Sequence, residues 1–139
     1  MQINKDKSFF KEYHIEIYSY RVLFSYNQTN DEFYKSVKKH FKSRGIDEED
    51  DSTSEDMLKL DHAEAMTYFL SHRTVAMRVF KHSNKDFNEL MDSLCHEALH
   101  VTCDITKGIQ IELSEDTEEV FCYLIGHIIN KIVKDLVKL

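Results

Sequence analysis

The chain has 139 residues, a length typical of one compact domain, and 42% of them are hydrophobic, which indicates a globular fold with its own core. Its formal net charge of −7 argues against nucleic acid as the main partner, because phosphate binding requires clustered lysine and arginine. The first residues lack the apolar core of a signal peptide, and no run of about 18 apolar residues predicts a membrane helix. We therefore expect one domain over residues 1–139, located in the cytoplasm.

The first half of the chain predicts strands followed by one helix. Aromatic and β-branched residues dominate the segment Tyr13–Tyr26, which is typical of one long strand or of a hairpin. Thr29 and Glu32 then form a T-x-x-E capping box, which predicts a helix that ends near Arg44. The segment that follows, about residues 45–60, contains an acidic run with seven carboxylates, and we expect it to be a solvated loop.

The second half begins with two short segments of strand-like composition, residues 63–70 and 74–80. Only three residues separate them, so we expect the two segments to pair as a hairpin. Ser83 and Asn84 are suitable N-caps for a helix from about residue 85 to residue 105.

A last helix is expected at the end of the chain. Gly108 breaks the preceding helix, residues 109–113 form a short extended link, and Ser114 is expected to cap the last helix. Acidic residues in its first turn suit the positive end of the helix dipole. Together the elements predict an α+β fold, with a small mixed sheet of three or four strands packed against three helices.

The expected helix over residues 85–105 carries an HExxH motif. His96 and His100 are four residues apart, so both imidazoles project from one face of the helix and can share one metal ion. Glu97 follows the first histidine and is placed to take a proton from a zinc-activated water molecule. The motif therefore predicts one zinc ion bound by His96 and His100, with Glu97 as general base.

The stretches HEALHVTCDI and SEDTEEVFCYLIGHI resemble the gluzincin class of zinc metallopeptidases. More closely, they resemble small uncharacterised metallopeptidase-like proteins of tailed bacteriophages, over roughly residues 83–129. The resemblance implies a minimal zincin-like domain in which the HExxH helix and the C-terminal helix pack on the sheet. It also implies that a glutamate from the helix after HExxH is the third zinc ligand.

Two neighbouring glutamates are candidates for this third ligand. Glu118 shares a broad apolar face with Phe121, whereas Glu119 heads a column with Cys122 and Gly126. These small residues would let the two helices approach closely, and the gluzincin pattern has a small residue three positions after its ligand. We favour Glu119 and keep Glu118 as the alternative.

The sequence departs from the gluzincin pattern at Tyr123, where that class often has an acidic residue. A carboxylate that orients a histidine would then come from elsewhere, and Asp104, four residues after His100, is a candidate. Tyr123 and His127 are the candidates for stabilising an oxyanion.

The cysteines allow a second interpretation of the metal site. Three cysteines are few and odd in number, which argues against a disulfide framework. We expect them to be free thiols, metal ligands or small core residues. Cys103 follows the two histidines on their helix face, and Cys122 lies in the next helix. With His96 and His100 they would form a closed structural zinc site without an open position for catalysis. A third interpretation is that His96 and His100 are a partly buried pair of helix residues that bind no metal.

The sequence therefore predicts a zinc-dependent metallopeptidase that acts on a peptide or protein substrate. The strand before the HExxH helix is expected to be an edge strand and one wall of the cleft, where an extended peptide could pair. The alternative is a non-catalytic, zinc-stabilised phage assembly or virion protein. A second copy of the chain or a phage protein is a further candidate partner, and the expected location of a phage-encoded chain is the host cytoplasm or the virion.

Overall fold

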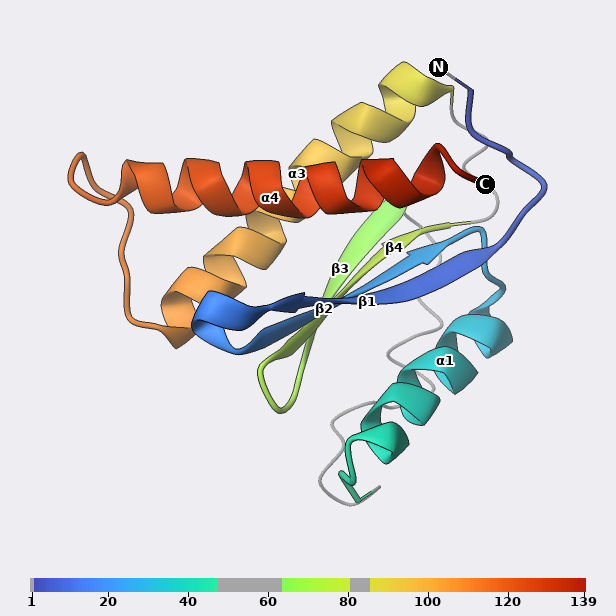
Figure 1. Ribbon diagram of the computed structural model, residues 1–139, viewed down its shortest axis with the longest axis horizontal. Helices are drawn as coiled ribbons and strands as arrows, with labels where there is room; N and C mark the ends of the chain where they lie inside the picture. Colours follow the sequence, from blue (N-terminus) through green and yellow to red (C-terminus); the bar gives the residue numbers. More distant parts are fainter. Residues whose placement is uncertain (1, 48–63, 81–85) are drawn as a thin grey trace.

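The computed structural model describes residues 2–47, 64–80 and 86–139, which form an α+β fold with a four-stranded mixed sheet and three α-helices (Figure 1). This confirms the predicted α+β class with a small mixed sheet and three helices. The elements, in chain order, are β1 (Phe9–Ile15), a 3-10 turn η1 (Glu16–Tyr18), β2 (Tyr20–Tyr26), α1 (Asn30–Ser43), β3 (Ala65–Leu70), β4 (Thr74–Val79), α3 (Phe87–Gly108) and α4 (Glu118–Leu136).

The sheet is built from two hairpins joined side by side. Its strand order is β1-β2-β4-β3, in which β1 and β2 pair antiparallel, β3 and β4 pair antiparallel, and β2 and β4 pair in parallel. The hairpin predicted for residues 63–80 is confirmed, and of the two alternatives for Tyr13–Tyr26 the structure shows the hairpin, whose first strand already begins at Phe9. The parallel pairing between them places β2 and β4 inside the sheet and leaves β1 and β3 at its edges.

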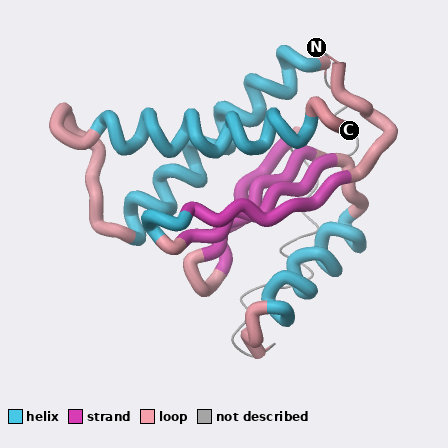
Figure 2. The backbone as a smooth tube through the Cα atoms, in the orientation of Figure 1, coloured by secondary structure: helices cyan, strands magenta, loops and turns pink. Residues whose placement is uncertain are grey.

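Helices cover both faces of the sheet, with α3 and α4 on one face and α1 on the other (Figure 2). The side chains of the central strands alternate between two cores: Val22, Phe24, Val75 and Met77 face α3 and α4, whereas Leu23 and Ala76 face α1. Because β2 and β4 are buried on both faces, apolar residues occupy consecutive positions in them, as in Val22–Phe24 and Val75–Met77, rather than alternating with exposed polar ones.

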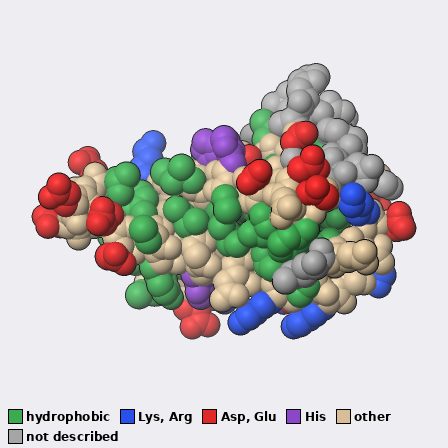
Figure 3. Space-filling model, turned by 90° about the horizontal axis from the view of Figure 1, so that it is seen from above, with side chains coloured by type: hydrophobic (Ala, Val, Ile, Leu, Met, Phe, Trp, Pro, Cys, Tyr) green, Lys and Arg blue, Asp and Glu red, His purple; other side chains and the backbone are tan. Residues whose placement is uncertain are grey.

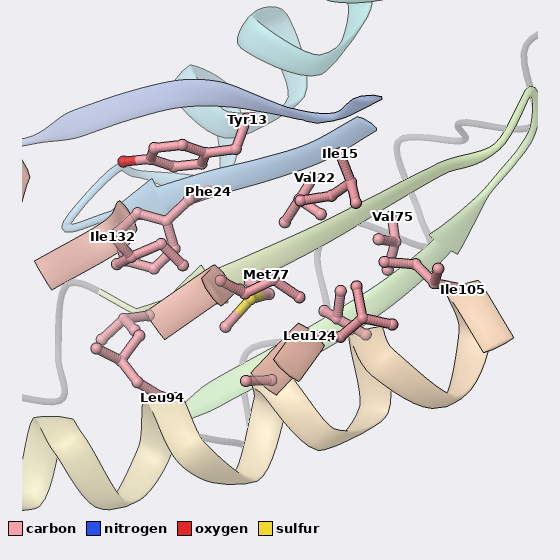
Figure 4. Packing of buried hydrophobic residues seen from close by; sticks show 14 of the residues in the cluster. Tyr13, Ile15, Val22, Phe24, Val75, Met77, Leu94, Ile105, Leu124 and Ile132 are labelled. Carbon is pink, nitrogen blue, oxygen red and sulfur yellow. The ribbon is translucent and has the colours of Figure 1, made fainter. Parts of the chain in front are cut away.

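The larger core fixes the two C-terminal helices against the sheet (Figure 4). Leu94 and Ile105 of α3, together with Leu124 and Ile132 of α4, point toward the strands. Each of these four side chains is at most 1% exposed. Burial of one such side chain stabilises the fold by about 1.5–3 kcal/mol, so this layer holds α3 firmly in place beside β3.

Helix α1 begins as predicted. The Thr29 hydroxyl accepts a hydrogen bond from the Glu32 backbone amide, and the Glu32 carboxylate accepts one from the Thr29 amide. The helix ends at Ser43, close to the predicted end, and buries Phe33, Val37 and Phe41 against the sheet.

Helix α3 extends further along the chain than predicted, to Gly108. Asp86 is its N-cap and forms a second capping box with Glu89. The predicted caps Ser83 and Asn84 lie outside the described residues, as does most of the predicted acidic loop over residues 45–60.

The predicted start of the last helix is wrong. Ser114 does not cap α4, which begins at Glu118 with Thr117 as the residue before it. The Thr117 hydroxyl accepts a hydrogen bond from the Ser114 amide, and the Glu118 amide donates to the Ser114 carbonyl oxygen. These bonds close residues 114–117 into a turn before the helix starts. None of the helices among the described residues combines the length and apolar character needed to cross a membrane.

Candidate metal centre

The HExxH motif lies in the middle of α3, and its two histidines face solvent. The helix buries Leu94, Ala98 and Val101 against the sheet and α4. The 3.6-residue period then places positions 96 and 100 on the opposite side, and both imidazoles are exposed. Figure 3, a view from above the sheet, shows histidine side chains standing out from the surface, with acidic side chains nearby.

The two imidazole rings converge on one point. The Nε2 atoms of His96 and His100 lie 3.2 Å apart, and the ring centroids lie 4.9 Å apart. A neutral imidazole has one nitrogen that donates and one that accepts, so this contact is a hydrogen bond when one Nε2 carries the proton. When both Nε2 atoms are unprotonated, each offers a lone pair, and the short distance between the two atoms would allow one cation to bind both.

Glu97 lies on a different side of α3 from the histidines and is only 7% exposed. Its Oε2 atom accepts a hydrogen bond of 2.5 Å from the hydroxyl of Thr67 in β3. The same hydroxyl lies 3.4 Å from the Glu97 carbonyl oxygen. Helix α3 therefore presents the two imidazoles to solvent and the carboxylate to the neighbouring edge strand.

An open cleft with a volume of about 450 Å³ adjoins this group of side chains. It lies between the start of β3 and the N-terminal half of α3. Its lining consists of Glu64, Ala65, Glu89, Asp92, Ser93, His96 and Glu97. Four of these residues are acidic and, within the described residues, no lysine or arginine lines the cleft. The resulting negative potential favours the approach of cations.

The wall of the cleft differs from the prediction. The strand that directly precedes α3 in the sequence is β4, and this strand lies inside the sheet rather than at its edge. The edge strand beside the cleft is β3, which supplies Ala65 to the lining and Thr67 to the contact with Glu97. The order of the two strands could not be read from the chain, because it depends on the parallel pairing of β4 with β2.

The structure brings together the two histidines but not the predicted third ligand. Residues 2–47, 64–80 and 86–139 contain no group of three or more His, Cys, Asp or Glu side chains that could hold a metal ion. Glu118 and Glu119 are exposed in the first turn of α4.

The close helix approach at Cys122 and Gly126, which favoured Glu119 as the third ligand, is also not found in the structure. A Cβ atom added at Gly126 would meet nothing within 4 Å, so this position is not in a close helix contact. Cys122 is exposed rather than packed between the helices.

All three cysteines are exposed, which excludes the interpretation that they are small core residues. Cys103 shares the solvent-facing side of α3 with His96 and His100. Together with Cys122 it does not form a four-residue site with the histidines within the described part of the chain. Within the described residues, the structure therefore shows a close pair of histidines without a third potential metal ligand grouped with them.

The other candidate residues lie apart from the histidine pair. Burial raises the pKa of the Asp104 carboxyl group, against the opposing charge of Lys107. The Asp104 carbonyl oxygen accepts a long hydrogen bond from the Tyr20 hydroxyl, at 3.5 Å. Among the described residues, Asp104 makes no hydrogen bond to an imidazole, so the role expected of it as an orienting carboxylate is not seen.

Tyr123 and His127 stack on one another along α4, with ring centroids 5.4 Å apart. Burial and the nearby charge of Lys131 lower the pKa of His127, which favours its neutral form. Tyr123 is 56% exposed, so the pair forms part of the surface of α4. Neither residue lines the cleft beside His96.

Thr67 is the residue at this site that the sequence did not reveal. A threonine within a strand is ordinary, since β-branched residues favour strands. Its contact with Glu97 depends on the register of β3 and on which sheet edge α3 covers, and neither is encoded locally. Asp92 could have been found from its spacing. It lies four residues before His96, and residues four apart share a helix face, so both could have been expected on the same side of α3.

Comparisons of the chain with protein-family models, curated proteins and solved structures found no match. Any function for this chain is therefore inferred from the arrangement of His96, Glu97 and His100 and from the cleft beside them.

Proposed function

We propose that this chain is a zinc-dependent peptidase with a minimal zincin-like domain, in which His96 and His100 bind the metal and Glu97 is the general base. The observation that carries this proposal is that the Nε2 atoms of His96 and His100 lie 3.2 Å apart, while His96 and the buried Glu97 line the same acidic cleft. A purely structural histidine pair has no need of an adjacent carboxylate held against the cleft wall.

The spacing of the two nitrogens fits zinc. Two nitrogens that are each about 2.0–2.1 Å from a tetrahedral zinc ion lie roughly 3.3 Å apart. The Nε2 atoms of His96 and His100 lie 3.2 Å apart, close to this value. Little side-chain movement is therefore needed to form a chelate, and the acidic cleft raises the local concentration of cations.

A catalytic zinc site uses three protein ligands and one open position. We propose Glu119 as the third ligand, with Glu118 as the alternative. Since neither carboxylate is grouped with the imidazoles in the described residues, this assignment requires the first turn of α4 to move toward α3 on metal binding.

The chemistry follows from the positions of the chain's own groups. When bound, zinc supplies Lewis-acid activation of water and of the scissile carbonyl group. Glu97 takes up the proton released from the water and passes it to the amine that leaves, so the products are a carboxylate and an amine. As the last strand of the sheet among the described residues, β3 could offer main-chain hydrogen bonds to an extended peptide, which would place the substrate along the wall that contacts Glu97.

A non-catalytic zinc-binding protein, such as a phage assembly or virion component, is the second candidate. It is favoured by the absence, within the described residues, of a third ligand beside the histidines. Cys103 is exposed on the same helix side and would give a closed site with Cys122 if the two were brought to the metal. In such a protein Glu97 would have no chemical role.

The two candidates differ in their response to Glu97→Gln. The test incubates zinc-loaded wild-type protein with a diverse peptide library and identifies cleavage products by mass spectrometry. A peptidase loses at least about a hundredfold of its activity on Glu97→Gln, because general-base catalysis contributes about 10²–10⁴. The variant must retain its zinc for the comparison to hold. The peptidase proposal is overturned if Glu97→Gln still cleaves peptides at the wild-type rate. It is also overturned if the zinc-loaded wild-type protein cleaves no peptide.

A further inference from the structure

The hydroxyl group of Thr67 holds the proposed general base in place. We infer that Thr67 is a positioning residue for Glu97: its hydroxyl fixes one carboxylate oxygen and directs the other toward the reaction. This inference rests on the proposed peptidase function, whereas the contact between Thr67 and Glu97 is seen directly in the structure.

The contact joins β3 to α3, two elements that are not consecutive in the chain. Thr67 is the third residue of β3. Its hydroxyl group donates a hydrogen bond to Glu97 Oε2, with 2.5 Å between the two oxygen atoms. Hydrogen bonds to an ionised carboxylate are short and about twice as strong as neutral ones. Because Glu97 is only 7% exposed, water competes little for this oxygen, and the bond defines the rotamer of the side chain.

The two oxygens of the carboxylate then have separate tasks. Oε2 is engaged by Thr67, whereas Oε1 has no hydrogen-bond partner among the described residues. Oε1 is therefore the atom that accepts the proton from water and later releases it to the leaving amine. Without the Thr67 hydroxyl, the carboxylate would be free to rotate, and a misplacement of about 1 Å can cost a hundredfold in rate.

The position of Thr67 also ties the base to the substrate. β3 is the strand at the sheet edge, and its residue Ala65 lines the cleft. The strand that would pair with an extended peptide is thus the same strand that holds the carboxylate. This arrangement sets the distance between the peptide backbone and Glu97 within one rigid element.

Two substitutions separate the hydroxyl from the bulk of the side chain. Thr67→Val keeps the shape and removes the donor, whereas Thr67→Ser keeps the donor and removes a methyl group. For a positioning residue, we expect Thr67→Val to lower kcat about ten- to a hundredfold with KM changed less than about twofold, and Thr67→Ser to restore most of kcat. Thr102→Val is the matched control, because the buried Thr102 hydroxyl has no hydrogen-bond partner among the described residues.

A second readout does not require catalysis. The side-chain carboxylate ¹³C resonance of Glu97, measured by NMR in the metal-free protein, should move in Thr67→Val and remain near its wild-type position in Thr67→Ser and Thr102→Val. Kinetics in the Glu97→Gln background complete the test. There Thr67→Val should lower kcat no further, because two residues that act as a unit are not additive.

The outcomes distinguish this inference from the proposed function. A wild-type protein that cleaves peptides while Thr67→Val matches it in kcat overturns the role of Thr67 and leaves the peptidase intact. An equal loss of kcat in Thr67→Val and Thr67→Ser also overturns it, since packing rather than the hydroxyl would then matter. Zinc-loaded wild type without peptidase activity overturns the proposed function and the positioning role with it, even where the NMR shift shows the contact.

Discussion

His40 of α1 and Glu12 of β1 form a partly buried contact between the helix and the sheet, with Nδ1 and Oε2 3.0 Å apart. Arg21 of β2 also binds Glu12, and Arg44 lies beside the His40 ring. Burial lowers the pKa of His40 from its ordinary value of 6.5, and the charge of Arg44 acts in the same direction, whereas Glu12 opposes them. Burial acts to raise the pKa of Glu12, but Arg21 and His40 outweigh it and hold that pKa low.

The stability of the protein should therefore decrease on acidification. Below pH 6.5 the unfolded chain binds a proton at His40 that the folded chain resists, so the free energy of unfolding falls as the pH drops toward the folded pKa. The depressed pKa of Glu12 acts in the same direction at lower pH, because the folded carboxylate takes up its proton later than the unfolded one. A single group contributes a slope of at most about 1.4 kcal/mol per pH unit.

Urea unfolding of wild type and His40→Asn at several pH values between 4 and 8 checks this prediction. The variant should show a flatter dependence just below pH 6.5, where the imidazole of the unfolded chain takes up its proton more readily than that of the folded chain. An unchanged slope in the variant would mean that His40 is not the group responsible.

Gly108, the last residue of α3, packs directly against the ring of Tyr20. A Cβ atom at this position would lie 2.1 Å from the Tyr20 Oη atom and 3.0 Å from Cζ. We expect Gly108→Ala to destabilise the fold by about 1–3 kcal/mol, the usual cost of overpacking. Tyr20→Phe removes the closest atom, so the double variant should recover part of the loss in thermal unfolding. Additive effects of the two substitutions would contradict the clash.

Gly126 provides the opposite case on α4. Nothing lies within 4 Å of a Cβ atom built there, and the residue is inside the helix. Gly126→Ala should stabilise the protein by up to about 1 kcal/mol, because alanine has the higher helix propensity. A loss of stability in thermal unfolding would contradict the open surroundings of Gly126.

The third ligand is tested by substitutions at three exposed positions. If α4 supplies the ligand, Glu119→Gln weakens zinc binding by more than about tenfold, whereas Glu118→Gln and Cys103→Ser leave it within about threefold of wild type. The measurement is competition with a chromophoric chelator. Loss of zinc in Cys103→Ser would favour the closed site, and loss in Glu118→Gln alone would transfer the role to that residue.

The local elements of this fold could be predicted from the sequence because their signals are local. The capping box of Thr29 and Glu32 starts α1, and the aromatic segment around β1 and β2 folds as a hairpin. The HExxH spacing was sufficient to place His96 and His100 on one helix face, and their Nε2 atoms converge as that spacing requires.

The features that could not be predicted depend on contacts between distant segments. The parallel pairing of β2 with β4 joins residues about fifty positions apart, and it alone decides that β3 is the edge strand. That pairing also brings Thr67 to Glu97. The assignment of the third ligand failed to find support for the same reason, since the path of α4 across α3 is set by tertiary packing rather than by the small residues Cys122 and Gly126.

The binding of zinc by His96 and His100 is tested most directly by calorimetric titration of zinc into the metal-free protein. Wild type should bind one zinc ion per chain, and Glu97→Gln and the control His14→Ala should bind it equally well. His96→Ala and His100→Ala should each weaken zinc binding by at least roughly 10- to 100-fold. Loss of a residue that only hydrogen-bonds to a metal ligand already has an effect of this size. Binding that is unchanged in both histidine variants, or absent in wild type, would contradict the paired-histidine metal centre.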